Sequence, residues 1–296
     1  MRPLAPGPRS SPPAPRYNRS SHKETHLKPL VLCALLLAVA SLASAQTPPA
    51  KLQVLIVTGQ NIPAHDWRVN TPVLRKLLED SGRFEVRVAE EFRGAGPETL
   101  APYDVVVLNY DDNRKPELRW GERTDAAFLN YVRAGKGLVI YHFSTAAFEG
   151  WTEFEKMCGA NWRPNHGHHS ARHNFTVDIQ DKQHPITRGM KASFPHASDE
   201  LYANLQWQPE GAYHVLATAW DDHSLYRPNE KQPLPGAGLN EPMLWTVNYG
   251  KGRVFVTALG HDPEAMKSAG FIVTFTRGTE WAATGGVTIP LPDELK

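Results

Sequence analysis

The feature that most constrains the fold is a regular alternation of short apolar runs with helical patterns from Lys51 onward. The apolar runs read KLQVLIVTG, FEVRVAE, YDVVVLNY and KGLVIYH, and helical periodicity separates them at residues 71–80 and in DAAFLNYVRAG. Continuous apolar strands are typical of a parallel sheet that is buried on both faces. The sequence therefore predicts an α/β fold, with a three-layer, mostly parallel sheet and helices on both faces.

Local signals predict where these helices begin and end. Asn70 supplies an N-cap and Pro72 a first-turn proline for a helix that starts at Thr71. Gly135 closes the second helix, because glycine readily adopts the left-handed conformation that follows a helix end. The local signals thus agree with the apolar periodicity.

The pattern changes after His142. A long segment rich in His, Asn, Trp and Gly, GANWRPNHGHHSARHN, precedes the alternating strand NFTVDI, and such an insert in a compact domain is usually functional. Strands resume at YHVLATAW and in a hairpin that turns at residues 249–252, and a last helix is expected over 271–283. Residues 46–296 are predicted to form one domain.

Residues 1–45 have the order of a leader and secretory signal peptide. Lys23 and Lys28 precede the run LVLCALLLAVASLASA, which ends in small residues before Gln46. The run is short for a membrane span, which favours cleavage over a retained anchor. We therefore expect export to the periplasm or the extracellular space, with no stable membrane span after cleavage.

Charge and motifs argue against two kinds of ligand, nucleic acids and nucleotide cofactors. Residues 1–45 carry six basic and one acidic side chain, which leaves 26 basic against 30 acidic in the remainder, a net charge of about −4. That balance does not favour a nucleic-acid partner. The turn TGQNIPAHDW after the first strand has no GxGxxG or P-loop pattern, so no nucleotide cofactor is expected.

The two cysteines, Cys33 and Cys158, cannot form a disulfide in the mature chain if the leader is removed. Cys158 lies in FEKMCG, at what is predicted to be a helix end, without a neighbour that would activate a thiol. We therefore predict a small buried apolar side chain and not a nucleophile.

Three histidines fall at or after the carboxyl ends of predicted strands. His65 follows the first strand, His142 ends LVIYH, and His261 ends VFVTALGH. Open α/β sheets build their sites at this edge. A single histidine so placed is usually structural, but three that converge on one edge predict a site.

A second group of polar residues lies in HASDELY, which contains His196, Asp199 and Glu200. A carboxylate beside an imidazole can orient it, raise its basicity or share a metal ion with it. The same residues would also suit a helix N-terminus capped by Ser198. Both interpretations stay open from the sequence.

The loop histidines raise the question of a metal. His166, His168, His169 and His173 are close enough in sequence to ligate zinc, but HGHHSARH matches no standard zinc motif. A bound divalent metal and a metal-free binding or acid–base role therefore both remain open.

Several long motifs resemble the ThuA-like (trehalose utilisation) family. They are HPITRGM, DELY, EPMLWTVNYGKGRVFVTALGHDPEAM and RGTEWAATG, and the resemblance covers about residues 51–292. It implies a fold similar to class I glutamine amidotransferases, with a flavodoxin-like topology. Those enzymes carry a nucleophilic cysteine after a central strand, where this chain has residues 142–146 without cysteine. The chain is therefore not expected to be a glutamine amidotransferase, and Ser144 is a weak substitute outside any GxSxG motif.

The resemblance implies an enzyme of oxidised-sugar metabolism that acts on a keto-sugar of the 3-keto glycoside type. Isomerisation, epimerisation or cleavage would each need a base and a group that holds the enolate oxygen. We assign catalysis to His142, Glu200 and His261. Substrate binding is assigned to His65, Trp67, His173 and His196, and Trp151 and Trp162 could also offer apolar faces to a sugar ring.

Two other functions remain open beside this carbohydrate enzyme. One is a non-catalytic carbohydrate-binding protein of the periplasm, and the other is a metal-dependent hydrolase built on the loop histidines. Self-association into a homo-oligomer also stays open.

Overall fold

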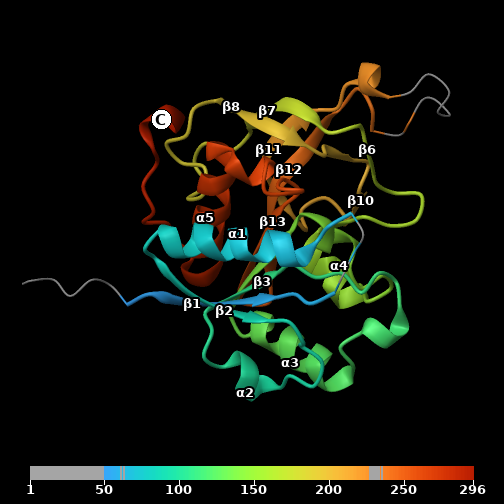
Figure 1. Cartoon of the computed structure of the whole chain (residues 1–296), viewed down its shortest axis with the longest axis vertical. Coiled ribbons are helices and arrows are strands. Elements are labelled where there is room, and N and C mark those ends of the chain that lie inside the picture. Colours follow the sequence, from blue (N-terminus) through green and yellow to red (C-terminus); the bar gives the residue numbers. More distant parts are fainter. Residues whose placement is uncertain (1–49, 61, 63, 227–233, 235) are drawn as a thin grey trace, which may run out of the picture. The chain divides into compact units, whose positions relative to one another are not determined.

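A nine-stranded sheet organises the residues that the computed structural model describes, which are 50–296 except 61, 63, 227–233 and 235 (Figure 1). Its strands are β1 Leu52–Val57, β2 Phe84–Ala89, β3 Val105–Leu108, β4 Gly137–Tyr141, β7 His173–Ile179, β8 Ser193–Asp199, β11 His214–Trp220, β12 Asn240–Tyr249 and β13 Gly252–Thr257. The strand order is β2-β1-β3-β4-β13-β12-β11-β7-β8.

Helices and short strands complete the architecture. The α-helices are α1 Trp67–Asp80, α2 Pro97–Leu100, α3 Glu122–Arg133, α4 Thr152–Cys158 and α5 Ala269–Thr284. Short 3-10 helices are η1 Pro116–Leu118, η2 His142–Ala146, η3 His223–Leu225, η4 Ala265–Lys267 and η5 Asp293–Leu295. Two small ribbons pair β5 Ala160–Asn161 with β10 Gln206–Trp207, and β6 His168–His169 with β9 Tyr202–Ala203.

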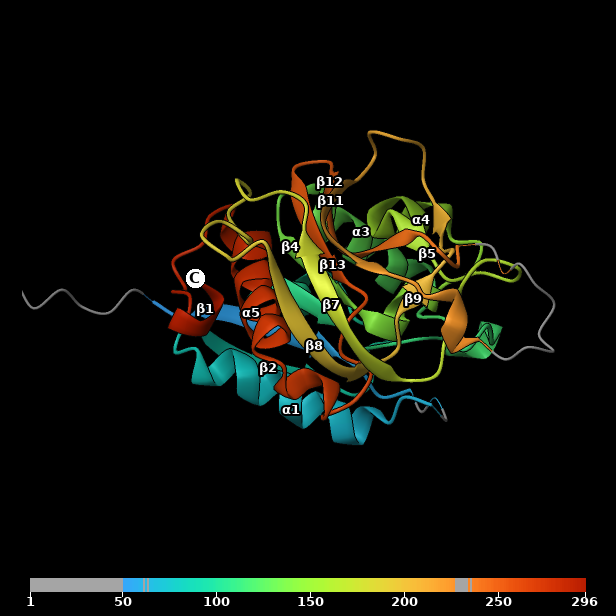
Figure 2. The ribbon, with the colours of Figure 1, turned by 90° about the horizontal axis from the view of Figure 1, so that it is seen from above.

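The first half of the sheet is parallel and covered on both faces. All pairs from β2 to β13 in the strand order are parallel. Helices α1 and α5 pack on one face, and α3 and α4 pack on the other (Figures 1 and 2). Every residue of β3 and β4 is buried, which explains their continuous apolar sequences.

The second half of the sheet is antiparallel. Strand β13 pairs with β12, and the order then continues through β11, β7 and β8 with antiparallel pairs only. The expected α/β class is confirmed, and the large sheet is mixed, because this antiparallel extension adds strands to the mostly parallel sheet that the sequence predicted. It carries the polar segment with Glu200 back to the edge where β4 and β13 end.

The start of α1 differs from the sequence prediction. The helix begins at Trp67, and the Asp66 side chain caps it by accepting a hydrogen bond of 3.0 Å from the Arg68 N–H. Asn70 is therefore not the cap, and Pro72 lies inside the helix. Instead, the Asn70 side-chain amide donates to the His261 carbonyl at 3.1 Å, which ties α1 to the end of β13.

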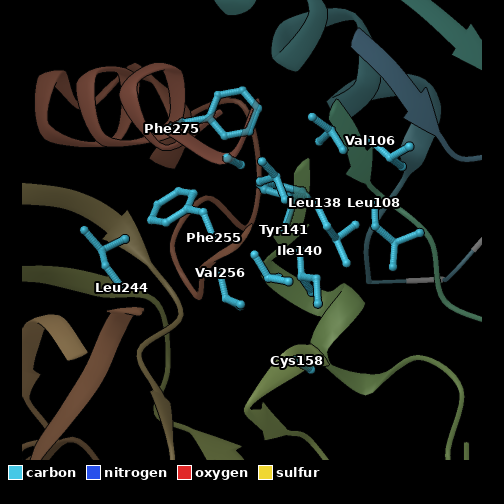
Figure 3. Packing of buried hydrophobic residues seen from close by; sticks show 14 of the residues in the cluster. Val106, Leu108, Leu138, Ile140, Tyr141, Cys158, Leu244, Phe255, Val256 and Phe275 are labelled. Carbon is cyan, nitrogen blue, oxygen red and sulfur yellow. The ribbon is translucent and has the colours of Figure 1, made fainter. Parts of the chain in front are cut away.

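The last helix and the hairpin are confirmed. Strands β12 and β13 turn at Tyr249–Gly252 as predicted. Helix α5 buries Phe271, Phe275 and Trp281. Gly278 lets this helix approach the sheet closely, because a Cβ there would lie 2.2 Å from the Phe255 ring. Figure 3 shows Phe255 and Phe275 on the side of α5, and Cys158 on the opposite side of the strands.

The described residues belong to one compact unit, Pro49–Lys296. The predicted leader and signal peptide, residues 1–45, lies outside the described residues. Within the described part of the chain, no helix has both the length and the apolar character needed to cross a membrane.

A buried carboxylate on α5 leads to the first prediction. Glu280 accepts hydrogen bonds from the Arg83 guanidinium at 2.8 Å and from the Thr288 and Ile289 N–H groups at 2.7 and 3.0 Å. Burial alone would raise the pKa of Glu280, but the bonds from Thr288 and Arg83 outweigh it and lower the pKa. Its contribution to stability is therefore present above its ordinary pKa of 4.5 and is lost as the pH falls below that value.

Glu280→Gln should lower the free energy of unfolding by about 2 kcal/mol at neutral pH, because an amide NH₂ replaces one of the two carboxylate oxygens, each of which accepts two hydrogen bonds. The difference from the unmutated protein should shrink at about pH 3, below the ordinary pKa of 4.5, because the stabilisation that the carboxylate provides declines as the pH falls below that value. Urea denaturation at both pH values measures this. Glu85→Gln, at an exposed pair, should change the free energy by less than about 0.5 kcal/mol. Equal losses at both pH values would contradict the prediction.

Candidate active site

His142 begins the site at the carboxyl end of β4. Its backbone has a φ of +42°, in the left-handed region that non-glycine residues seldom adopt. Its ring Nδ1 lies 2.6 Å from the Ala258 carbonyl, which can only accept, so Nδ1 carries the proton. Nε2 is then an acceptor and receives the Tyr202 hydroxyl at 2.9 Å. Contacts at both ring nitrogens thus fix the tautomer and the orientation of this imidazole.

Glu200 follows β8 and lies among three imidazoles. Its Oε2 is 3.1 Å from His261 Nδ1 and 3.6 Å from His142 Nε2, and its Oε1 is 3.6 Å from His169 Nε2. Burial alone would raise the pKa of Glu200, but the contacts with His142 and His261 lower it far below its ordinary value. The carboxyl group is therefore ionised at any working pH.

His65 closes the cluster from the loop between β1 and α1. Its ring stacks on Phe143 with centroids 4.6 Å apart and planes at 9°. The rings of His142 and His261 meet it edge-on at 5.0 and 4.7 Å. Burial, followed by the neighbouring His142 and His261, lowers the pKa of His65 to about 2. His65 is therefore a neutral imidazole.

Asp199 positions the segment that carries His261. One carboxylate oxygen accepts from the N–H groups of Glu200 and His261 at 2.8 and 3.0 Å. The other lies 2.7 Å from His196 Nε2 and 2.6 Å from the Gly260 N–H. The carboxylate is fully buried, and these contacts lower its pKa although burial opposes them. It joins the end of β8 to the loop after β13.

These residues bring one ligand atom each from four segments to a common point. The nitrogen or oxygen atoms of His65, His142, Glu200 and His261 all lie within 4.8 Å of one another. The structure thus brings together all three predicted catalytic residues and one of the four residues predicted to bind substrate.

A pocket of about 260 Å³ opens onto this cluster. Its polar and aromatic lining includes His65, Asp111, Arg114, Trp162, His169 and Glu200. A larger hollow of about 570 Å³ lies against β7, β8 and the C-terminal segment, but it lacks the cluster. We therefore take the smaller pocket as the candidate site.

Asp111, Asn113 and Arg114 line this pocket and were not predicted from the sequence. Asp111 follows β3, and burial, together with the neighbouring Asp112, raises its pKa to about 6. The signal was present, because NYDDNR places polar residues directly after a buried strand, as at His142. Asn113 and Arg114 have φ values of +48° and +55°, a local geometry that no sequence pattern announced.

Three residues predicted to bind substrate lie elsewhere. Trp67 packs in the first turn of α1, where the Arg68 guanidinium lies 4.4 Å from its ring centroid. His173 lies at the start of β7, with Nδ1 3.0 Å from the Ala171 carbonyl. His196 is buried behind Asp199 and does not line the pocket. The alternative of a helix N-terminus at Ser198 is wrong, because these residues form the end of β8.

Neither candidate nucleophile is available for catalysis. The Ser144 hydroxyl is buried, donates to the Leu108 carbonyl and accepts from the Tyr110 N–H, both at 2.9 Å. Cys158 is buried as predicted, and burial raises its pKa to about 12. The site therefore offers proton transfer and charge stabilisation, and not covalent catalysis by these two side chains.

Comparison with known proteins shows which family the chain is similar to. A family model described as ThuA, trehalose utilisation, matches residues 53–282. A ThuA-like protein from Parabacteroides merdae ATCC 43184 is 33% identical, with a TM-score of 0.71 over 83% of this chain and 95% of its own. No curated protein matches the chain.

Two more distant structures share the fold alone. A ThuA-like protein from Bacteroides uniformis ATCC 8492 is 20% identical, with a TM-score of 0.61 over 82% of this chain and 97% of its own. A cytoplasmic protein from Salmonella typhimurium is 12% identical, with a TM-score of 0.56 over 78% of this chain and 99% of its own.

The second prediction concerns Asp199. Asp199→Asn should lower the free energy of unfolding by about 3 kcal/mol, because an amide NH₂ would face N–H donors in a buried site. Denaturant titration measures this change. Asp178→Asn, at an exposed position of β7, is the matched control, and a change below about 0.5 kcal/mol is expected. A similar small change for both variants would show that Asp199 does not organise the site.

Proposed function

The chain belongs to the ThuA family, described as trehalose utilisation, as its motifs predicted, and from that premise we propose an exported enzyme that acts on a sugar or keto-sugar. The proposed substrate is of the 3-keto glycoside type, and the reaction is an isomerisation, epimerisation or cleavage. One observation carries this proposal: Asp111 and Glu200 line one pocket with pKa values shifted in opposite directions. Such divergence provides an acid and a base at the same pH.

The proposed reaction begins with proton transfer beside a keto group. The Glu200 carboxylate accepts the proton from the adjacent carbon, and the C–H electron pair forms the double bond of an enol. Asp111, protonated below about pH 6, gives its proton to the carbonyl oxygen. When the enol O–H loses its proton and the carbonyl re-forms, return of a proton to the opposite face of the same carbon gives an epimer. Where that carbon carries a hydroxyl, loss of the hydroxyl proton and protonation of the former carbonyl carbon give an isomer. Cleavage follows when the carbonyl re-forms, the double bond moves to the next carbon, and a substituent of that carbon leaves with its bonding electron pair and takes up the proton.

The low pKa of Glu200 sets a requirement on this chemistry. A carboxylate whose pKa lies far below its ordinary value is a weak base. The substrate carbonyl must therefore be strongly polarised before its neighbouring C–H becomes acidic enough. Because both nitrogens of His142 are already engaged, we assign that residue a positioning role.

The size and lining of the pocket support a small polar substrate. Its volume of about 260 Å³ is at the lower end for ligand pockets. Trp162 offers an aromatic face, and Asn113 and Arg114 carry hydrogen-bond donors in the same pocket lining. A sugar ring presents both an apolar face and hydroxyl groups, which suits this combination.

The strand order supports the finer topology that we propose. The parallel order β2-β1-β3-β4-β13 corresponds to the flavodoxin-like order 2-1-3-4-5. We propose on this basis the three-layer, amidotransferase-like arrangement, with the site at the carboxyl ends of the strands. Export is proposed from the predicted leader in residues 1–45.

The third prediction tests catalysis. Glu200→Gln should lower kcat/KM on a panel of 3-keto glycosides by about a hundredfold or more, because the amide cannot accept the proton. Glu210→Gln, an exposed substitution, should keep full activity. Saturable binding of these sugars by the unmutated chain without turnover would instead identify a carbohydrate-binding protein.

The fourth prediction concerns pH. The pKa of Asp111 is raised from 3.8 to about 6, so its proton is lost as the pH rises through 6, and kcat/KM should fall over that range. Asp112 and Arg114 are the charged groups near this carboxyl, and they act on its pKa in opposite directions. Asp111→Asn should lower activity about a hundredfold and remove this decline. A decline that persists in the variant would assign it to another group.

A further inference from the structure

The charge of Glu200 is not balanced by a permanent cation. Its side chain is 10% exposed, and its ion-pair partners among the described residues are the imidazoles of His142, His169 and His261. An imidazole is charged only when protonated. Burying a carboxylate is unfavourable unless a positive charge is paired with it. The cluster is therefore chemically suited to a cation.

Two ring nitrogens in the same cluster lack hydrogen-bond partners. His65 Nδ1 and His261 Nδ1 are both buried, and neither has a hydrogen-bond partner among the residues that the structure describes. His65 as a whole is 8% exposed. Buried polar atoms are nearly always satisfied, so two unsatisfied nitrogens beside an unbalanced carboxylate point to a missing ligand.

The distances have the scale expected for ligands of one ion. His261 Nδ1 lies 3.1 Å from Glu200 Oε2 without an aligned hydrogen bond, and His142 Nε2 lies 3.6 Å from the same oxygen. Metal–ligand bonds of 2.0–2.1 Å in a tetrahedron separate neighbouring ligand atoms by about 3.3 Å. The widest separation within the set of four, at most 4.8 Å, requires a modest contraction around the ion.

We propose that His65, His142, Glu200 and His261 bind one first-row divalent metal ion, of which Zn²⁺ and Co²⁺ are representative. Three imidazoles with one carboxylate favour such an ion over Mg²⁺ or Ca²⁺, which prefer oxygen ligands. The Nδ1–H bond from His142 to the Ala258 carbonyl is the outer contact that commonly orients a metal-bound imidazole.

Tyr202 makes this assignment unusually testable. Its hydroxyl donates to His142 Nε2 at 2.9 Å, and the ion would need the same lone pair. Metal binding must therefore displace this hydroxyl from the nitrogen. Removing the hydroxyl with Tyr202→Phe should leave metal affinity unchanged or increase it, whereas loss of a ligand should decrease it.

The use of the ion in catalysis rests on the proposed function, while metal binding itself does not. A bound divalent ion would act as a Lewis acid that polarises the substrate carbonyl before proton transfer. Glu200 Oε1 faces His169 and not the other imidazoles, so it stays available to accept a proton.

The fifth prediction is tested with the full chain, purified without a metal-affinity tag and stripped with a chelator. Titration with Co²⁺ should give visible absorption that saturates at one ion per chain, and elemental analysis after Zn²⁺ loading should give the same stoichiometry. Glu200→Gln and His65→Ala should each weaken binding by at least about a hundredfold, more than the loss of an outer-shell contact. His214→Ala, at an exposed pair with Asp181, is the matched control and should bind as the unmutated chain does.

Circular dichroism of each variant separates lost ligands from lost folding. Absence of stoichiometric binding, or equal affinity in folded Glu200→Gln and His65→Ala variants, would overturn the metal site. Full turnover by a metal-free enzyme would overturn its catalytic use and leave the proposed function standing. Conversely, a loaded protein without turnover on keto-sugars would support the metal site and contradict the proposed function.

Discussion

The Asp199 carboxylate is the contact on which the geometry of the site depends. It accepts three backbone N–H groups and faces His196, and so fixes both the residue that follows it, Glu200, and the loop that carries His261. These two segments belong to different halves of the sheet, since β8 is the antiparallel edge and β13 is central. Without this buried carboxylate, nothing in the strand pairing alone would bring Glu200 to the end of β13. The antiparallel extension therefore brings the Glu200 carboxylate to the imidazole cluster, whereas the parallel half supplies Asp111.

The electrostatics of the pocket follow from the position of Glu200. Glu200 is ionised and its ion-pair partners are imidazoles, while burial keeps the nearby His65 neutral. Asp111 follows β3, and burial raises its pKa although the hydrogen bond from the Asn113 N–H opposes the shift. Two carboxyl groups in one pocket thus acquire opposite pKa shifts, because one has imidazole neighbours and the other has a second carboxylate beside it. The acid and base roles proposed for them are consequences of which strand end each residue follows.

Much of this site was predictable from the positions where strands end. The rest depended on where helix α1 begins. His142 and His261 were predicted because each ends a continuous apolar run, and Glu200 because it lies beside an imidazole in HASDELY. The same rule applied after β3 would have found Asp111. Trp67 was predicted to bind substrate, but α1 starts four residues earlier than the sequence indicated, which places this side chain within the first turn of the helix. Helix starts depend on which of several capping residues tertiary contacts select, and here Asn70 is used to hold the His261 carbonyl.

The turn after β4 shows how one strained position can serve different chemistry. In the proposed amidotransferase-like topology, a sharp turn after a central strand is suited to presenting a nucleophile, because the left-handed residue there projects its side chain out of the sheet. His142 has this conformation, yet its ring is held at Nδ1 by a carbonyl and at Nε2 by a hydroxyl. The side chain is therefore held in one orientation, with Nε2 at 3.6 Å from Glu200 Oε2, and it is not free to attack a substrate. A strained backbone conformation persists when the surrounding contacts stabilise it. At His142 these contacts are the Ala258 carbonyl and the Tyr202 hydroxyl, which hold the ring in one orientation. The chemistry available at this turn is accordingly the binding of a proton or a cation, which connects the acid–base proposal with the proposed metal site.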